Sequence, residues 1–300
     1  MKKLLAFAIM VMFAGALLAL VGCGQAEDSL GGAKSMKDDA RDLADGIRVA
    51  AIDVGKGDCI LVQAGGSSAL IDAGYGGTSD EVVSYLRNQG VGRLEFLVIT
   101  HYDKDHVGGI RAIGKAFDIG MIYLPGYKGA DKQYRTAMDA VDGLGVPTQS
   151  VTQEQSLKLG DASFAIVPTS LTYIPNASGG EGNDNDLSLV AALTFRNDSY
   201  LFAGDLEKEG IDAYLKGNRG RFDVLKMPHH GEKSGGTDEF LEDVQPKIAI
   251  VTDSADDPAD KKTLKLLDNC GADTYCTSAC GTVVVESNGT GSYSVSIDNR

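Results

Sequence analysis

Three apolar segments of this chain each end in side chains that can bind a metal ion. The segments are residues 94–99 (LEFLVI), 199–204 (SYLFAG) and 223–227 (DVLKM). Each is typical of a buried strand, and sites in open α/β sheets lie at strand ends. The side chains that follow the segments are His101, Asp103, Asp105 and His106, then Asp205, and finally His229 and His230. Because these include all four histidines of the 300 residues, the sequence predicts one site assembled by three strand ends.

Imidazole nitrogens together with carboxylate oxygens suit a borderline dication such as zinc or manganese. Alternating residues of an extended turn point in different directions, so the ligands between positions 101 and 106 cannot all serve one ion. Two ions that share a bridging carboxylate would use all of them. We therefore expect two divalent metal ions, with zinc as the first choice and manganese as the alternative. A merely solvated loop rich in histidine and aspartate is the structural alternative.

From residue 47 onward, each half of the chain begins with β-hairpins and then alternates strands and helices. One helix is predicted at residues 79–90, another beginning at Pro258. One hairpin is predicted to turn at Asn197-Asp198, and the closing hairpin at Asn288-Gly289. This pattern predicts the α/β class, with two mixed sheets packed face to face and helices outside, a four-layer αββα sandwich.

The first 22 residues have the features of a secretory signal, with two lysines, an apolar run and small residues before Cys23. The run is also long enough to cross a bilayer as an uncleaved anchor. The local sequence LVGC, however, resembles the bacterial lipobox, whose cysteine is lipidated. We therefore expect a lipoprotein signal peptide at 1–22, a flexible tether at 23–46 and one globular domain at 47–300. The lipid would hold an exported protein on the outer face of the cytoplasmic membrane of a bacterium.

The formal net charge of −14 gives a surface that repels polyanions. Any action on nucleic acid would therefore need bound cations or a local basic patch.

Four cysteines remain after Cys23, and export permits disulfides among them. We expect one bridge among Cys270, Cys276 and Cys280, with Cys59 as a small core residue. The pairing itself stays open, because four cysteines allow three connectivities.

Seven segments, in this order along the chain, resemble the metallo-β-lactamase superfamily. They are IDVGKGDCILV, ALIDAG, LVITHYDKDHVGG, NDLSLV, LFAGDLE, DVLKMPHHG and FLEDVQPKIAIVT. Within the superfamily they look most like the hydrolase domain at the C-terminus of bacterial competence (DNA-uptake channel) proteins, over roughly residues 47–290. We expect a stand-alone, lipid-tethered relative of that domain, with the superfamily's four-layer fold.

The resemblance implies a metal role for residues that match the family's motif. His101 and Asp103 would bind the first metal, Asp105 and His106 the second, Asp205 would bridge the two, and His230 would be the last histidine ligand. His229 would then face the substrate, with the exchange of roles between the two neighbours as the alternative. Many members have one more histidine, which this chain lacks between positions 107 and 228. Asn185 would fill that gap as a weak ligand or through a water, and the harder first site makes manganese a real alternative to zinc.

The candidate catalytic residues are Asp105, His229 and Lys226. Lys226 would meet a phosphate, or else serve a structural role in its strand. Asp72 would orient a histidine as a supporting partner, while Asp53 and Asp72 could equally be turn-forming aspartates.

These residues imply hydrolysis of a phosphodiester by metal-bound hydroxide. The first candidate substrate is extracellular nucleic acid, including DNA, by analogy with the competence domain. Phosphodiesters of cell-wall polymers or lipid headgroups are the alternative substrates. A catalytically idle, metal-dependent surface binding protein is the alternative of a different class. Beyond the substrate and the membrane reached through the lipid, the sequence predicts no protein partner.

Overall fold

The computed structural model describes residues 45–175, 182–217 and 219–298. The predicted signal peptide, Cys23 and all but the last two residues of the predicted tether lie outside this part of the chain. Within these ranges, no helix combines the length and the apolar character that a membrane-spanning segment needs.

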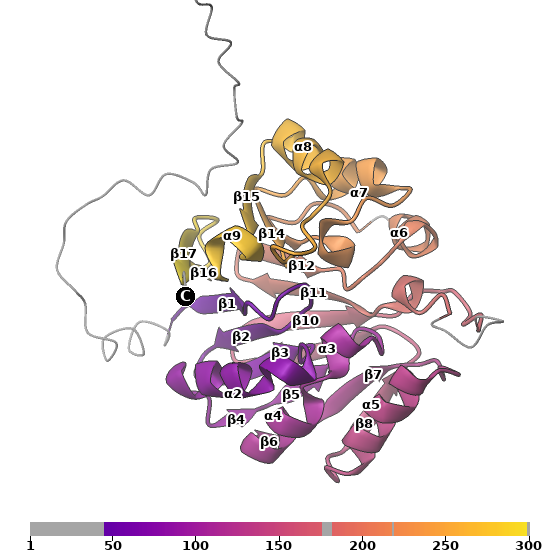
Figure 1. Ribbon diagram of the computed structural model, residues 1–300. Coiled ribbons are helices and arrows are strands. Elements are labelled where there is room, and N and C mark those ends of the chain that lie inside the picture. The colour runs from indigo at the N-terminus through magenta and orange to yellow at the C-terminus, as the bar shows by residue number, and fades with distance from the viewer. Residues whose placement is uncertain (1–44, 176–181, 218, 299–300) are drawn as a thin grey trace, which may run out of the picture.

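Two large sheets form the centre of the molecule (Figure 1). The first has the strand order β17-β16-β1-β2-β3-β5-β7-β8 and the second the order β15-β14-β13-β12-β11-β10-β9. The strands of the first sheet are β1 (Ile47–Ala51), β2 (Ile60–Ala64), β3 (Ser67–Ile71), β5 (Phe96–Val98), β7 (Ile122–Pro125), β8 (Thr148–Val151), β16 (Thr282–Ser287) and β17 (Ser294–Asp298). Those of the second are β9 (Gln155–Leu159), β10 (Ala162–Val167), β11 (Val190–Phe195), β12 (Asp198–Phe202), β13 (Val224–Lys226), β14 (Ile248–Val251) and β15 (Asp273–Cys276). A short additional pair joins β4 (Arg93–Leu94) to β6 (Asp118–Ile119).

Helices cover the outer face of each sheet, as Figure 1 shows. The first sheet carries α2 (Ser79–Asn88), α3 (Lys104–Val107), α4 (Ile110–Ala116) and α5 (Lys132–Asp142). The second carries α6 (Lys208–Leu215), α7 (Thr237–Val244) and α8 (Lys261–Cys270), and α9 (Thr277–Cys280) leads into β16. Short 3-10 turns are η1 (Gly76–Thr78), η2 (Asn185–Leu187) and η3 (Pro228–Gly231).

Side chains alternate between the two faces along each strand, and the central strands of both sheets bury residues on both faces. In β1, Ile47, Val49 and Ala51 lie in the core between the sheets, whereas Ala50 packs toward the helices. A third core cluster joins the second sheet to α6, α7 and α8. Burying apolar surface in three layers stabilises the predicted four-layer αββα sandwich, which is confirmed.

The parallel pairing of neighbouring strands determines where the site lies. β3, β5 and β7 run parallel in the first sheet, and β12, β13 and β14 run parallel in the second. The carboxyl ends of parallel strands meet at one edge of a sheet. The loops after β5, β12 and β13, which carry the predicted ligands, therefore converge between the two sheets with the loop after β3, which carries Asp72.

Three predictions of where a hairpin turns or a helix begins are wrong, and tertiary contacts explain the differences. The first two concern hairpins. Phe195 pairs with Asp198, so the β11–β12 hairpin turns at Arg196-Asn197, one residue earlier than predicted. The loop between β16 and β17 spans residues 288–293 rather than the two predicted, because it docks against that turn. Arg196 donates a hydrogen bond to the carbonyl of Asn288 (2.9 Å).

The helix predicted to begin at Pro258 begins at Lys261. The backbone N–H of Ala259 donates to the carboxylate of Asp253 (3.0 Å), and Asp260 has an extended backbone. These contacts keep the residues before Lys261 outside the helix.

The predicted disulfide is also wrong: all four cysteines of the described residues are thiols. Cys276 packs in the core between the second sheet and its helices, whereas Cys280 packs in the core between the sheets. Cys270 is exposed at the end of α8. The three side chains thus face different surroundings, while Cys59 is buried in the core, as expected.

Candidate metal centre

The loop after β5 reaches the site through backbone contacts with two neighbouring loops. The N–H of Ala73 donates to the carbonyl of His106 (2.7 Å), and the N–H of Asp58 donates to that of Asp105 (3.1 Å). Gly57 permits the second approach, because a Cβ there would lie 2.7 Å from the Asp105 carbonyl oxygen. Gly57 of the GKGD segment thus allows close packing against the ligand loop.

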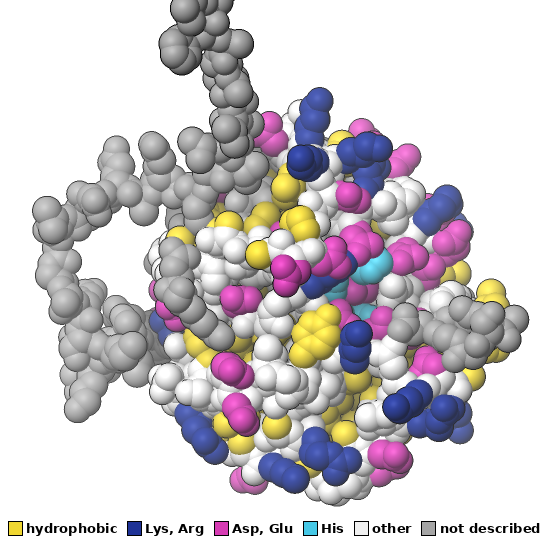
Figure 2. All heavy atoms as spheres, in the orientation of Figure 1, with side chains coloured by type: hydrophobic (Ala, Val, Ile, Leu, Met, Phe, Trp, Pro, Cys, Tyr) yellow, Lys and Arg dark blue, Asp and Glu magenta, His cyan; other side chains and the backbone are white. Residues whose placement is uncertain are grey.

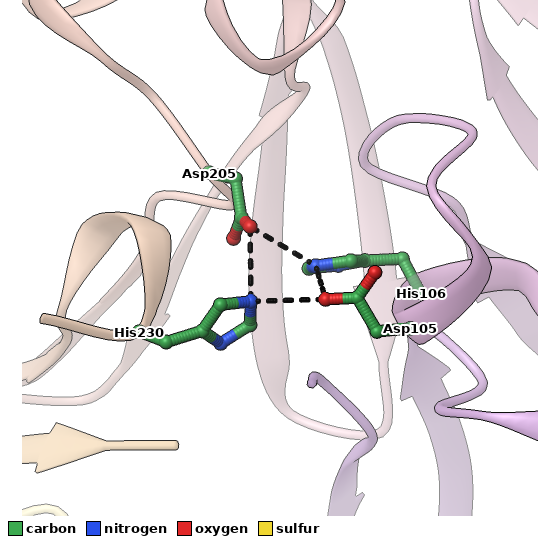
Figure 3. A group of neighbouring side chains, drawn as sticks. All are labelled: Asp105, His106, Asp205 and His230. Atoms are coloured by element: carbon green, nitrogen blue, oxygen red, sulfur yellow. Dashed lines mark ion pairs between the residues drawn. The ribbon is translucent and has the colours of Figure 1, made fainter. Parts of the chain in front are cut away.

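Asp105, His106, Asp205 and His230 converge on one point between the sheets (Figure 3). Asp205 Oδ2 lies 2.9 Å from His230 Nε2 and 3.2 Å from His106 Nε2. Asp105 Oδ2 lies 3.3 Å and 3.6 Å from the same two nitrogens. One donor atom from each residue lies within 4.8 Å of the others, which is the arrangement of a four-ligand cation site.

Two threonine–aspartate pairs fix the imidazole tautomers. Thr252 Oγ1 donates to Asp58 (2.7 Å), so it accepts from His230 Nδ1, which lies 3.0 Å away. Thr100 Oγ1 likewise donates to Asp72 (2.7 Å) and lies 3.0 Å from His101 Nδ1. In both cases the Nδ1 carries the proton, and the Nε2 lone pair is left for the centre of the site.

His106 is oriented directly by Asp72, whose Oδ2 lies 2.8 Å from the Nδ1 of the ring. Asp72 also accepts from the backbone N–H of Thr100 (2.8 Å). Its left-handed backbone (φ 57°) turns the chain so that the carboxylate points back beneath the site. This contact supports the orienting role expected for Asp72.

The ligand atoms fit a metal ion. Within the described residues, Nε2 of His101, His106 and His230 is buried and takes part in no hydrogen bond. Buried polar atoms are normally satisfied, so three imidazole nitrogens aimed into one polar space indicate residues that can hold a cation. Imidazole nitrogens with carboxylate oxygens are the donor set of a borderline divalent ion.

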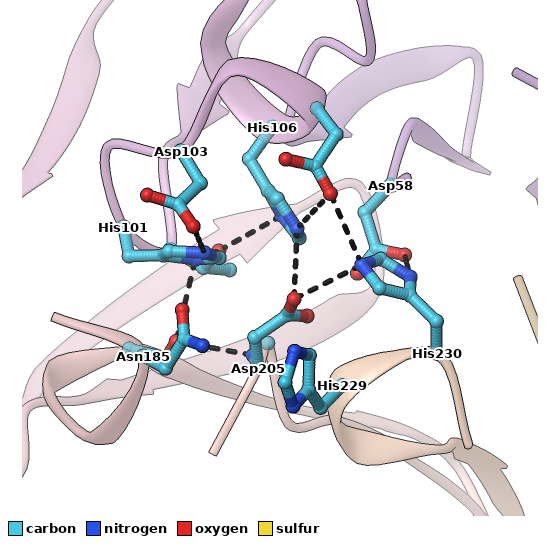
Figure 4. A network of polar contacts seen from close by, with 12 residues as sticks. Asp58, His101, Asp103, His106, Asn185, Asp205, His229 and His230 are labelled. Carbon is cyan, nitrogen blue, oxygen red and sulfur yellow. Dashed lines mark hydrogen bonds and ion pairs between the residues drawn. The ribbon is translucent and has the colours of Figure 1, made fainter. Parts of the chain in front are cut away.

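His101, Asp103 and Asn185 lie together on the other side of the network (Figure 4). His101 Nε2 is 3.8 Å from Asp103 Oδ2, and its ring centroid is 4.1 Å from that of His106. Asn185 donates through Nδ2 to Glu207 (3.2 Å), while its buried Oδ1 receives no hydrogen bond. These three polar side chains therefore lie beside the four-ligand cluster.

Burial and neighbouring charges shift the pKa values of the buried histidines in different directions. Burial, reinforced by His106, lowers the pKa of His101 well below its usual value. Burial also acts to lower the pKa of His106 and of His230. The negative charge of Asp205 outweighs burial at both rings, so the pKa of His106 is raised well above its usual value and that of His230 is raised. Burial works to raise the pKa of Asp105, but His230 and His106 bring it down to about 2. The carboxylates of the site thus favour the protonated form of the His106 and His230 rings, whereas burial favours the neutral form of His101.

Lys226 is fully buried beneath the site rather than open to solvent. Its Nζ lies 2.5 Å from Asp58 Oδ2, 3.3 Å from Asp205 Oδ1 and 3.1 Å from the carbonyl of Gly204. The lysine therefore contacts the predicted bridging aspartate directly, and its ammonium has no exposed surface for a phosphate.

Asp58 was missed by the sequence analysis, which singled out Asp53 from the same segment. Asp58 is 1% exposed and contacts both Lys226 and Thr252. Asp53 accepts a hydrogen bond from the N–H of Gly55 (3.1 Å), a turn contact. The position of Asp58 directly before the wholly apolar start of β2 is the one signal that could have revealed it.

His229 and His230 point in different directions, because both have left-handed backbones (φ 46° and 53°). His230 enters the ligand cluster, whereas the His229 side chain is 20% exposed at the rim. His229 Nδ1 lies 3.3 Å from Glu207 Oε1. On the face shown in Figure 2, histidine side chains reach the surface among several acidic ones. The geometry thus favours His230 over His229 as the ligand.

A family model described as the metallo-beta-lactamase superfamily matches residues 52–252. ComE operon protein 3 of Bacillus subtilis is 27% identical over 220 residues, which cover 67% of this chain and 27% of that protein. Competence protein ComA of Neisseria gonorrhoeae is 27% identical over 204 residues, covering 67% of this chain and 26% of the relative. This chain thus spans about a quarter of the length of the curated relatives it matches.

Among solved structures, the metallo-beta-lactamase fold protein YhfI from Bacillus subtilis superimposes with a TM-score of 0.54 at 12% identity. The match covers 81% of this chain and 100% of that one. It supports the fold assignment independently of sequence identity.

Proposed function

Because the chain belongs to the metallo-beta-lactamase superfamily, we propose that its site holds divalent ions and hydrolyses phosphodiesters, with extracellular nucleic acid as the substrate. Asp105, His106, Asp205 and His230 would hold one ion. His101, Asp103 and Asn185, together with Asp205, would hold a second. The observation that carries the proposal is the convergence of buried imidazole Nε2 atoms that receive no hydrogen bond.

The donor sets suggest how the two positions differ. The first contains two imidazoles and two carboxylates, which favour zinc. The second contains one imidazole with oxygen donors, which makes manganese an alternative there. When bound, such ions supply Lewis acidity that lowers the pKa of a water and neutralises charge on a phosphate.

The chain's own residues divide the remaining work. Asp205 stands between the two donor sets, held by Lys226 from below. We propose that Lys226 acts by positioning Asp205, in place of the contact with phosphate considered from the sequence. His229, at the rim beside Glu207, is placed to donate a proton to a departing oxygen. Asp105, as a member of the ligand cluster, would help to orient the reacting groups.

The choice of nucleic acid rests on the similarity to relatives that include a competence protein. The net charge of −14 opposes a polyanion, so bound cations must offset it locally. Wall and lipid phosphodiesters remain the second substrate class, because the proposed lipid on Cys23 would hold the enzyme beside them. A catalytically idle binding protein is the alternative that turnover would reject.

The test is metal content measured together with turnover of bis(p-nitrophenyl) phosphate and of DNA by the full chain. We expect metal-dependent turnover of both that is abolished by Asp205→Asn. The matched control is Asp161→Asn, which alters an exposed aspartate in the β9–β10 turn. Bound metal without any turnover would favour the binding protein. Turnover of the small ester with intact DNA would favour wall or lipid esters.

A further inference from the structure

A pocket of about 480 Å³ lies beside the metal centre. This volume falls within the range of roughly 300–1,000 Å³ typical of small-molecule sites. Its walls include Tyr127, Tyr173, Leu187, Leu189, Thr169 and Lys128. The pocket thus combines aromatic and aliphatic surface with a few hydroxyl groups and one ammonium.

Two walls connect the pocket to His101. Leu187 and Leu189 flank Ser188, whose Oγ lies 3.4 Å from His101 Nδ1. On the other side, Tyr127 packs edge-on against Tyr102, the residue after His101, with ring centroids 5.1 Å apart. A substrate with its phosphate at the ligand cluster can therefore extend a neighbouring group into this pocket.

The aromatic wall contains a pair of stacked tyrosine rings. The rings of Tyr127 and Tyr173 stack nearly parallel, with centroids 5.2 Å apart and an interplanar angle of 16°. The hydroxyl of Tyr173 accepts a hydrogen bond from the N–H of Ala130 (3.2 Å), which ties that ring to the facing loop. Held aromatic surfaces of this kind bind nucleobases by stacking, with little dependence on which base is present.

Two of the residues that line the pocket, Tyr127 and Thr169, have hydroxyl oxygens that are shielded from solvent. A ligand in the pocket would therefore contact the aromatic rings and the leucines rather than these two hydroxyls.

From these contacts we infer that the pocket is a nucleobase subsite, which holds the base attached to the phosphate at the metal centre. The inference rests on the proposed function and names the part of the substrate that the enzyme binds. A base would stack against the tyrosine rings of the wall, and Lys128 would supply charge for an adjoining phosphate.

The experiment compares thymidine 5′-monophosphate with 2-deoxyribose 5-phosphate, which lacks only the base, by calorimetric titration of the metal-loaded full chain. We expect the nucleotide to bind roughly five- to hundredfold more tightly than the sugar phosphate. Tyr173→Leu should remove this preference. Thr172→Trp, at the exposed rim, should do the same by filling the pocket. The control Ile174→Ala changes a side chain that is 66% exposed on the same segment, and should keep the preference.

Equal affinity of the unmodified protein for the two ligands would overturn the subsite, while turnover of bis(p-nitrophenyl) phosphate would still uphold the hydrolase. A retained base preference without any turnover would support the pocket and reject the hydrolase. Tight binding of dihexanoyl phosphatidylglycerol that is lost in Thr172→Trp, with no base preference, would assign the pocket to an acyl chain and overturn the inference.

Discussion

The ammonium of Lys226 lies 2.5 Å from the carboxylate of Asp58 in the buried floor of the metal centre. Burial works to lower the pKa of Lys226, but Asp58 and Asp205 outweigh it and raise the pKa. The ammonium of Lys226 therefore stays charged, and it also reaches Asp205. It links the stability of the domain to the position of the proposed bridging ligand.

Lys226→Met should destabilise the domain by about 3–5 kcal/mol, because it leaves Asp58 charged and buried without its partner. Chemical denaturation of the metal-free protein measures this. The double variant Lys226→Met/Asp58→Asn should recover part of the loss, since no lone carboxylate remains. The control Lys208→Met removes a surface pair with Asp212 and should change little. A stability equal to that of the unaltered protein would show that the pair is dispensable.

Thr252→Val should weaken metal affinity roughly 10- to 100-fold, because the hydroxyl that fixes the tautomer of His230 is lost. The substitution keeps the shape of the side chain, so the fold should remain. Thr194→Val, on an exposed position of β11, is the matched control. Competition with a chromogenic chelator gives the affinities. Identical affinities for Thr252→Val and Thr194→Val would refute the orienting role.

Metal binding should release protons near neutral pH. The pKa of His106 is raised well above its usual value and that of His230 is raised, so both rings carry protons that an ion must displace. The carboxyl of Asp105, with a pKa of about 2, should release none. Metal affinity should therefore rise with pH until both rings have lost their protons. Titration calorimetry at about pH 6 in buffers of different ionisation enthalpy counts the protons, and a count of zero would contradict the assigned charges.

The predicted lipidation can be tested separately from the chemistry. Cys23→Ser should move the protein from the membrane fraction to the soluble fraction, because the single anchor is lost. Cys270→Ser, at an exposed thiol of the folded domain, is the control and should leave the protein in the membrane fraction. Unchanged fractionation of Cys23→Ser would reject the lipobox assignment.

The ligands at strand ends were predictable from the sequence, whereas most of the contacts that hold them, apart from that of Asp72 with His106, were not. His106, Asp205 and His230 lie in the loops that follow apolar strands, so their convergence follows from parallel pairing. The contact of Asp58 with Lys226 joins segments far apart in the chain, and no local pattern marks it. The turn at Arg196-Asn197 was likewise displaced by a contact with a distant loop. The disulfide was predicted from the number of cysteines alone, which carries no information on the separate cores in which Cys276 and Cys280 pack.

The central claim is tested most directly by a crystal structure of the full chain grown with excess zinc or manganese, using anomalous scattering to locate the ions. The account predicts an ion bound by Asp105, His106, Asp205 and His230, and a second beside His101 and Asp103. Nε2 atoms of His106 and His230 that hydrogen-bond to carboxylates, with no anomalous peak among them, would contradict it.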